Sequence, residues 1–303
     1  MTYKIFLTSF LIVVSTFVQA RENPSPADIQ LGAVKATVVE LNNGNTLYSK
    51  HSDWQTPIAS LTKLMTALVV VESSLDMNEW VMIPEPDRET RKNAYSRMRV
   101  SSTLKRKDLL RLALMSSENL AAYTLAASHP GGVDAFVAAM NKKAKALGMH
   151  NSRFVDPSGL SSRNVSTAAD LVHLVEAVAK YDVIREYSTT PSYTAHFRKP
   201  RYSLGYGNTN RLVHRNSWDI ELSKTGYITE AGRCLIMVSK VDGKDVAIVL
   251  LDAFGKLTPL GDAGRVKRWL TTGDGGKVAG AALRYEQAKS KEYPQQYDKV
   301  SSY

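Results

Sequence analysis

The chain has 303 residues, of which 44% are hydrophobic and 22% are charged, and its formal net charge is +10 at pH 7. These values are ordinary for a globular protein with one large domain or two small ones. The single cysteine, Cys234, excludes an intramolecular disulfide, and the six histidines lack the spacing of a metal site. Neither a metal nor another cofactor is therefore expected. The positive charge favours an anionic partner such as a cell-envelope polymer, but no nucleic-acid signature accompanies it, so nucleic acid is not expected.

The N-terminus has the layout of a secretory signal peptide. Lys4 precedes an apolar segment, residues 5–14, and Val18 and Ala20 supply small side chains at the −3 and −1 positions of a cleavage site. We expect residues 1–20 to be removed on export; the alternative is that they stay as an N-terminal anchor. No later segment has the length of apolar sequence that a membrane span needs.

The first half of the chain reads as a β-hairpin followed by helices. Two extended runs, residues 33–41 and 46–49, flank a turn of Asn and Gly, and a helix is expected from Ser60. Residues 73–100 read as loops with short strands. Apolar residues at helical spacing predict further helices at residues 108–115, 120–127, 133–147 and 167–180.

The second half begins with a stretch, residues 186–220, that is expected to be a long irregular connection. Two strands and a closing helix are then expected at residues 233–240, 246–252 and 264–271. Strands at both ends with helices between them predict an α+β fold, in which an antiparallel sheet is shared by the terminal segments and a helical subdomain is inserted. We expect one domain over residues 21–274 and a polar, flexible tail over residues 275–303.

A serine and a lysine stand three residues apart at the start of the first helix, in the sequence Ser60-Leu61-Thr62-Lys63. On a helix this spacing places the hydroxyl beside the amine, near backbone N–H groups that have no intrahelical partner. Such a serine can act as a nucleophile with the lysine as its base, or it can simply cap the helix. The pattern alone is weak, because Ser102 and Lys105 repeat it without the apolar run that follows Lys63.

Two further short patterns follow in order. They are Ser117-Glu118-Asn119, between two predicted helices, and Lys224-Thr225-Gly226, directly before the predicted strand pair. Each has a structural interpretation as a cap, a turn residue or an edge-strand charge. The ordered set SxxK, SxN and KTG is nevertheless the signature of penicillin-binding proteins and class A β-lactamases.

On these motifs the chain resembles the low-molecular-mass penicillin-binding proteins, which are serine D-Ala-D-Ala peptidases. Residues 57–66, 147–149, 154–160 and 166–170 carry further similarity, so that the resemblance covers roughly residues 30–255. It is most similar to the periplasmic D-alanyl-D-alanine endopeptidases of the penicillin-binding protein 7 type. The resemblance implies the β-lactamase/DD-peptidase fold, a periplasmic location, peptidoglycan as substrate and β-lactams as covalent inhibitors. Only one domain is implied, and the tail lacks the apolar face of a membrane-anchoring helix.

The resemblance also assigns roles to individual residues. Ser60 would be the nucleophile, Lys63 the general base, and Ser117 would pass a proton to the leaving amine. Lys63 would then need a depressed pKa, for which burial and repulsion from Lys224 are suitable causes. Backbone N–H groups of Ser60 and Tyr227 would form the oxyanion hole. The residues implied to bind substrate are Asn119, Lys224, Thr225, Gly226 and Tyr227.

Several alternatives stay open at this point. The resemblance favours hydrolysis of D-Ala–meso-diaminopimelate cross-links, with removal of terminal D-Ala by a carboxypeptidase as the nearest rival. A β-lactamase is disfavoured, because the middle motif has Glu118 where the β-lactamase signature has Asp and no residue matches the deacylating glutamate. We therefore expect β-lactams to acylate Ser60 and to leave slowly. A non-catalytic envelope protein that kept the fold is the remaining alternative.

Overall fold

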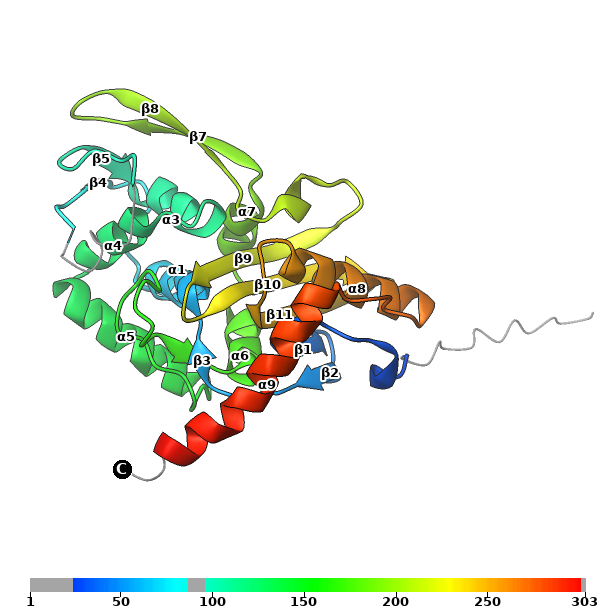
Figure 1. The fold of residues 1–303 in the computed structure, drawn as a ribbon. Helices are drawn as coiled ribbons and strands as arrows, with labels where there is room; N and C mark the ends of the chain where they lie inside the picture. The colour runs from blue at the N-terminus through cyan, green and yellow to red at the C-terminus, as the bar shows by residue number, and fades with distance from the viewer. Residues whose placement is uncertain (1–23, 87–95, 301–303) are drawn as a thin grey trace, which may run out of the picture.

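The structure is a computed structural model that describes residues 24–86 and 96–300, with side chains as far as residue 292. A five-stranded antiparallel sheet in the order β2-β1-β11-β10-β9 forms its centre (Figure 1). The strands are β1 (Ala33–Glu40), β2 (Asn45–Lys50), β9 (Ile220–Ile228), β10 (Gly232–Val241) and β11 (Lys244–Ala253). The expected signal peptide lies outside the described residues.

The two ends of the chain share this sheet. β1 pairs with β11 in a register that sets Ala33 opposite Ala253 and Glu40 opposite Val246. All eight residues of β1 are buried, because helices cover both faces of the sheet at its centre. The α+β fold that the sequence predicts, with terminal strands in one antiparallel sheet, is confirmed.

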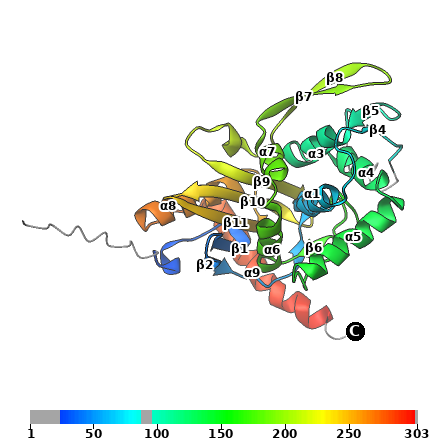
Figure 2. The ribbon, with the colours of Figure 1, turned by 180° about the vertical axis from the view of Figure 1, so that it is seen from behind.

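Helices lie on both faces of the sheet (Figures 1 and 2). One face carries α6 (Ala168–Val178), which contacts β1 and β11, and beyond it the helical region around α1 (Thr62–Glu72). The other face carries α8 (Thr258–Thr272) and α9 (Gly280–Val300). The remaining helices are α3 (Arg106–Met115), α4 (Asn119–Ala127), α5 (Gly132–Ala146) and α7 (Asp182–Thr189). Among residues 24–86 and 96–300 no helix combines the length and the apolar character that crossing a membrane requires.

Helix α1 is the centre of the helical region. Nine of its eleven residues, Thr62 to Val70, are buried, and it contacts α3, α4, α5 and α6. An apolar helix that is surrounded on all sides must be a core element. The 3₁₀ turn η2 (Ala59–Leu61) precedes it and packs against β9.

Three short ladders lie outside the main sheet. The hairpin of β7 (Ser192–Phe197) and β8 (Tyr202–Gly207) projects from the body, beside the pair β4 (Trp80–Met82) and β5 (Thr103–Lys105) (Figure 1). β3 (Thr56–Pro57) pairs with β6 (Val165–Ser166). The expectation of an irregular connection at residues 186–220 is therefore wrong. This stretch contains the β7–β8 hairpin, which is largely exposed on one face. Its mixture of small, polar and aromatic residues does not give the hydrophobic alternation by which a strand is predicted.

Strand β9 was not among the predicted strands, and it contains Lys224, Thr225 and Gly226. The sequence had placed this motif before the strand pair. Strand periodicity was obscured because Ser223 and Lys224 are both buried, although they are polar. Their polar atoms are satisfied by tertiary contacts, which a local pattern does not contain.

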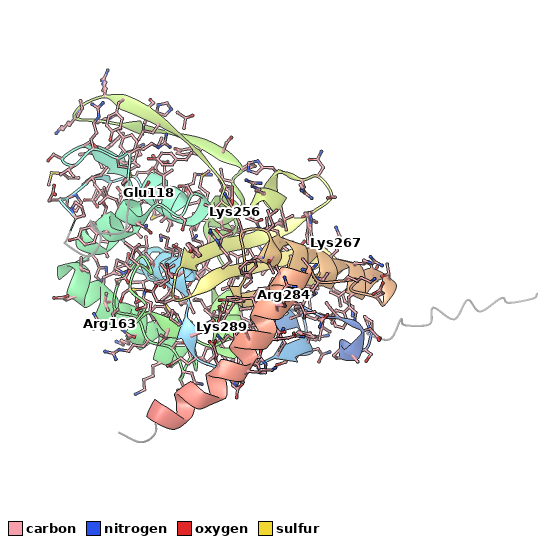
Figure 3. All side chains as sticks on the ribbon, in the orientation of Figure 1. Glu118, Arg163, Lys256, Lys267, Arg284 and Lys289 are labelled. Atoms are coloured by element: carbon pink, nitrogen blue, oxygen red, sulfur yellow. The ribbon has the colours of Figure 1, made fainter. Side chains whose placement is uncertain are left out.

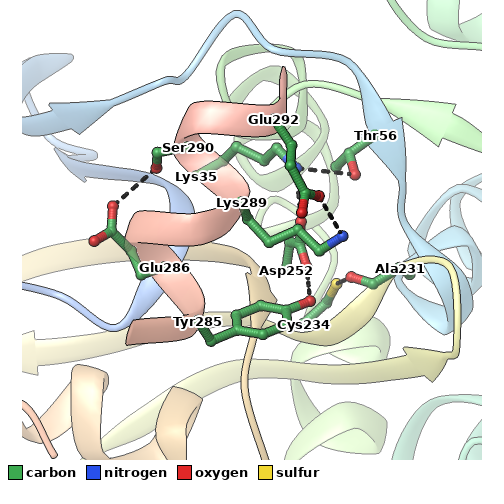
Figure 4. A network of polar contacts seen from close by, with 10 residues as sticks. All are labelled: Lys35, Thr56, Ala231, Cys234, Asp252, Tyr285, Glu286, Lys289, Ser290 and Glu292. Carbon is green, nitrogen blue, oxygen red and sulfur yellow. Dashed lines mark hydrogen bonds and ion pairs between the residues drawn. The ribbon is translucent and has the colours of Figure 1, made fainter. Parts of the chain in front are cut away.

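The expectation of a flexible tail is also wrong for its described part, since α9 packs against β1 and β11. Polar contacts hold it there: the Tyr285 hydroxyl donates to Asp252 Oδ1 at 2.7 Å (Figure 4). Lys50 Nζ lies 3.4 Å from Glu286 Oε1. Asp252 in turn accepts from the buried Lys35 amine at 2.9 Å. A polar composition therefore predicted disorder, whereas buried charged partners on the sheet stabilise the helix.

Candidate active site

Ser60 lies in the 3₁₀ turn η2, immediately before α1. The turn is unusual, because Ala59 has φ +47°, a left-handed conformation that non-glycine residues rarely adopt. Gly159, with φ +83°, lies against it so closely that a Cβ atom there would be 1.9 Å from the Ala59 carbonyl oxygen. Glycine is thus required at position 159 for the segment 154–160 to hold the strained turn that presents Ser60.

Lys63 is fully buried and its amine faces three oxygen atoms. Lys63 Nζ lies 2.9 Å from Ser60 Oγ, 2.7 Å from Asn119 Oδ1 and 2.6 Å from the Ser158 carbonyl oxygen. Burial lowers the Lys63 pKa to about 7, and Asp156 and Glu118 oppose that shift. Near neutral pH the amine therefore exists partly in the unprotonated form that can accept the Ser60 proton.

The second motif places Ser117 in the bend between α3 and α4, again with a left-handed φ of +60°. Lys224 Nζ donates to Ser117 Oγ at 2.9 Å and to the Thr225 carbonyl at 2.8 Å. Burial, together with the nearby charge of Lys63, holds the pKa of Lys224 well below its ordinary value. From the sequence, repulsion from Lys224 was expected to help lower the pKa of Lys63. In the structure burial lowers the pKa of Lys63, and the repulsion instead lowers the pKa of Lys224.

Glu118, to which the sequence assigned no role, fixes the position of Asn119. Its carboxylate accepts from the Leu120 N–H at 3.3 Å and so caps α4, whose first residue is Asn119. Burial raises the pKa of this carboxyl, while a hydrogen bond from Ser96 opposes the shift. Figure 3 labels Glu118 among the helices on the side of the site away from the sheet.

Strand β9 closes the site from the sheet side. A Cβ atom on Gly226 would lie 3.2 Å from the Ser60 nitrogen and 3.1 Å from the Ile58 carbonyl oxygen, so a larger residue would push the strand away from the Ser60 amide. Thr225 Oγ1 donates to Thr209 Oγ1 at 2.7 Å, and Tyr227 is half exposed at the edge. The structure thus brings all eight sequence-predicted site residues into one place.

A cleft of about 480 Å³ opens over these groups and extends to the start of α8. Lys63 and Lys224 do not line it, because they lie behind Ser60 and Ser117. Its lining includes Ser60, Ser117, Asn119, Thr225, Gly226 and Tyr227. In the described part of the chain, no group of three His, Cys, Asp or Glu side chains is placed to hold a metal ion.

Three cations at the cleft, Arg211, Arg233 and Lys256, were missed by the sequence reasoning. The Arg233 guanidinium lies 3.6 Å from the centre of the Tyr227 ring, and the two residues face each other across the β9–β10 ladder. Lys256 lies just before α8 (Figure 3). Within residues 24–86 and 96–292 none of the three has an ion pair with a carboxylate. A surface arginine has no local signal, but its register opposite Tyr227 could have been found from the β9–β10 pairing.

The arrangement defines a serine peptidase of the Ser-Lys type, with a buried lysine that is hydrogen-bonded to the nucleophile. A profile of the D-alanyl-D-alanine carboxypeptidase family, peptidase S11, matches residues 19–255. The chain belongs to this family, which confirms the resemblance that the motifs carry.

Similar proteins include the D-alanyl-D-alanine endopeptidase of Pseudomonas aeruginosa, 46% identical with 94% of each chain covered. The D-alanyl-D-alanine endopeptidase of Escherichia coli is 47% identical, over 86% of this chain and 84% of that protein. Among solved structures, the DD-transpeptidase of Streptomyces K15 superposes with a TM-score of 0.74 at 28% identity, covering 86% of this chain and 99% of that one. Penicillin-binding protein D2 from Listeria monocytogenes, in its cefotaxime-bound form, has a TM-score of 0.68 and 31% identity, covering 78% and 95%.

Proposed function

We propose that this protein is a D-alanyl-D-alanine endopeptidase that hydrolyses D-Ala–meso-diaminopimelate cross-links in peptidoglycan through an acyl-enzyme on Ser60. The observation that carries the chemistry is the pair of Ser60 Oγ and Lys63 Nζ, 2.9 Å apart, with the amine buried and its pKa lowered to about 7. The similarity to two D-alanyl-D-alanine endopeptidases supports the choice of reaction.

In the acylation step, neutral Lys63 accepts the Ser60 proton while Oγ attacks the carbonyl carbon of the D-Ala residue. The backbone N–H groups of Ser60 and Tyr227 stabilise the oxyanion of the tetrahedral intermediate, at about 3 kcal/mol for each donor. The C–N bond then breaks and the amine leaves with the proton that Lys63 took from Ser60, which passes to it through the Ser117 hydroxyl, so that Lys63 is neutral again. Lys224 donates to Ser117 Oγ and thereby holds this hydroxyl in place for the relay.

Deacylation returns the enzyme to its starting state. Water attacks the ester carbonyl, its proton passes to Lys63, and the ester C–O bond breaks as the Ser60 oxygen takes a proton back. Asn119 keeps Lys63 in place through the 2.7 Å hydrogen bond throughout. The sequence has no residue that matches the glutamate that speeds deacylation in class A β-lactamases, so a β-lactam acyl-enzyme is expected to persist.

The charge of the cleft fits an acidic peptide. The Thr225 hydroxyl lines the cleft and can bind the carboxylate next to the scissile bond, with the Lys224 amine behind it. Arg211, Arg233 and Lys256 give the outer cleft a positive potential. A cleft of about 480 Å³ also has room for more than a single terminal alanine. These features favour a cross-linked peptide as substrate.

The nearest competing function is that of a D-alanyl-D-alanine carboxypeptidase, the activity after which the family is described. Purified cross-linked muropeptide dimers and monomeric pentapeptides separate the two, with products identified by mass spectrometry. Conversion of dimers to monomers is expected. Release of D-Ala from pentapeptides while dimers stay intact would refute the endopeptidase assignment.

The covalent step is tested with fluorescent penicillin. Wild-type protein should retain the label after denaturation, and Ser60→Ala should not; Ser102→Ala, at the serine of the second SxxK pattern, serves as the matched control. Equal labelling of wild type and Ser60→Ala would exclude Ser60 as the nucleophile. Lack of labelling and of peptide hydrolysis in wild type would support a non-catalytic role instead.

We also propose a periplasmic location. It is supported by the signal-peptide layout of residues 1–20 and by the proposed substrate, which lies in the cell envelope. Detection of protein that begins near Arg21 in the periplasmic fraction is the expected result. An intact N-terminus in the membrane fraction would favour the anchor instead.

A further inference from the structure

The β7–β8 hairpin carries a second groove outside the active-site cleft. Near its tip the hairpin is held to β5 by two backbone hydrogen bonds between Thr103 and Arg198, at 2.8 and 3.0 Å. The groove between the hairpin and Trp80 has a volume of about 420 Å³. We call it the hairpin groove, and the residues of its lining on which the inference depends are Trp80, Phe197, Arg198, Arg201 and Tyr202.

Aromatic rings form the floor of the hairpin groove. The rings of Phe197 and Tyr202 are stacked with their centres 4.4 Å apart and nearly parallel, at 6°. Phe197 is buried and Tyr202 half-buried, so the stack ties the two strands of the hairpin together. Trp80, on β4, lines the groove together with this stack. The aromatic contacts thus give an otherwise exposed hairpin a fixed shape.

Cations stand on the faces of these rings. The Arg198 guanidinium lies 3.9 Å from the centre of the Trp80 ring, and Lys105 Nζ lies 5.6 Å from it. Arg99 is placed 4.8 Å from the centre of the Tyr202 ring. Stacking orients a guanidinium without using its N–H donors, which stay available for a bidentate anionic ligand.

The charge of the groove is not neutralised within the described part of the chain. Neither Arg198 nor Arg201 forms an ion pair with a carboxylate there, and both are exposed. Two other arginines of the same helical region differ, since Arg106 is paired with Glu79 and Arg111 with Glu186. Arg106 and Arg111 thus have acidic partners, whereas Arg198 is oriented by the Trp80 ring and, like Arg201, has no carboxylate partner among the described residues.

The position of the groove relates it to the active site. β8 ends at Gly207, and the next two residues, Asn208 and Thr209, line the catalytic cleft. The six residues of β8 span about 20 Å at ~3.3 Å per residue, so one rigid hairpin joins the cleft to the groove. A polymer that occupies the cleft can therefore reach the groove with another of its repeating units.

We propose that the hairpin groove is an exosite that binds carboxylates of a neighbouring stem peptide in the polymeric peptidoglycan whose cross-link lies in the cleft. The proposal rests on the proposed function, which supplies a polymer with a carboxylate-bearing peptide at regular intervals. Planar guanidinium groups match carboxylates by two parallel hydrogen bonds. A second contact on the same polymer raises the affinity for the polymer without changing affinity for an isolated peptide.

Binding is tested without hydrolysis, in Ser60→Ala protein. Cosedimentation with purified peptidoglycan sacculi is measured for this protein, for the same protein with Arg198→Ala and Arg201→Ala, and for a matched control with Lys142→Ala and Lys145→Ala. The control removes the same number of exposed positive charges from α5, away from the hairpin. The arginine variant should bind sacculi about tenfold more weakly, as expected for loss of one of two contacts, and the lysine variant should bind as before.

The activity arm uses proteins with Ser60 intact. The arginine variant should cleave soluble dimers and react with penicillin at the wild-type rate, but release products from sacculi about tenfold more slowly. Equal loss of sacculus binding in the arginine and lysine variants would show that the effect depends only on overall charge, and would overturn the proposal. Arginine-dependent binding to vesicles of anionic phospholipid, with sacculus binding unchanged, would overturn it in favour of a membrane contact.

These arms separate the exosite from the proposed function. If wild type fails to cleave dimers, the proposed function is refuted. Cosedimentation of Ser60→Ala protein with sacculi still measures whether the hairpin groove contributes to binding. If dimers are cleaved and the arginine variant binds and digests sacculi like wild type, only the exosite is refuted. Unchanged penicillin labelling of the arginine variant shows that its fold is intact.

Discussion

Lys63 and Lys224 are both fully buried, and each donates to a different serine of the same site, Lys63 to Ser60 and Lys224 to Ser117. Neither amine forms an ion pair with a carboxylate within the described residues. Burial lowers the pKa of both, and the charge on Lys63 lowers that of Lys224 further. Because the two amines repel each other, their titrations are coupled, and one proton is lost at a lower pH than the other. Burial at one site therefore sets the protonation of both amines.

The pH dependence of acylation follows from the pKa of Lys63. Since neutral Lys63 is the proposed base and its pKa is about 7, the rate of penicillin labelling should rise with pH through this region and level off above it. Stopped labelling reactions between pH 5 and 9 measure the profile. A rate that is independent of pH over this range would contradict Lys63 as the base.

Removal of the second amine should slow acylation without moving this profile. In Lys224→Met labelling should be slower, because Ser117 loses the amine that donates to it at 2.9 Å. The midpoint of labelling against pH should stay near 7, because burial and not Lys224 lowers the pKa of Lys63. Thr225→Val, which leaves both amines in place, is the control and should have the same midpoint. A midpoint in Lys224→Met well above that of Thr225→Val would show that repulsion from Lys224 also lowers the pKa of Lys63.

The stability of the protein should also increase with pH. A buried lysine with a lowered pKa binds fewer protons in the folded state than in the unfolded one, so the free energy of unfolding rises with pH between about 7 and ~10.4. The Lys63 shift corresponds to roughly 5 kcal/mol across that window. In Lys63→Met this part of the rise should disappear in urea unfolding measured at pH 7 and pH 9.5. An unchanged slope would show that Lys63 is protonated in the folded protein.

Gly159 should be essential for the strained turn at Ser60. Gly159→Ala places a Cβ atom 1.9 Å from the Ala59 carbonyl oxygen at a φ of +83°, and we expect a loss of about 3 kcal/mol in unfolding free energy together with slower penicillin labelling. Gly264→Ala is the matched control, because Gly264 lies in α8 with no atom within 4 Å of the added Cβ. It should be neutral or stabilise the protein by up to ~1 kcal/mol. Wild-type stability in Gly159→Ala would mean that the turn can relax.

The docking of α9 should depend on Tyr285. Tyr285→Phe removes the hydroxyl that donates to the buried Asp252, and we expect a loss of about 1–2 kcal/mol in unfolding free energy with unchanged penicillin labelling. Gln287→Ala, at an exposed position on the same helix, should have no effect. If Tyr285→Phe were as stable as Gln287→Ala, the contact would contribute nothing to docking.

The sequence predicted those features that are local. Apolar periodicity located the helices around α1, and β-branched runs located β1, β10 and β11. The spacing of Ser60 and Lys63 predicted their contact, because residues three apart on one helical turn are neighbours in any fold. In contrast, β9, the β7–β8 hairpin and α9 were missed, since their buried polar or exposed aromatic residues do not follow a simple hydrophobic period.

Tertiary structure decided everything that joins distant parts of the chain. Local pattern cannot place Lys224 against Ser117, 107 residues away, or Gly159 against Ala59. A local pattern also does not predict the lowered pKa of Lys63, because complete burial of the amine depends on helices α3, α4 and α5 packing around α1. The sequence of residues 60–63 by itself determines that Ser60 and Lys63 are neighbours. The reactivity of this pair comes from the low-dielectric site that the rest of the fold builds around it.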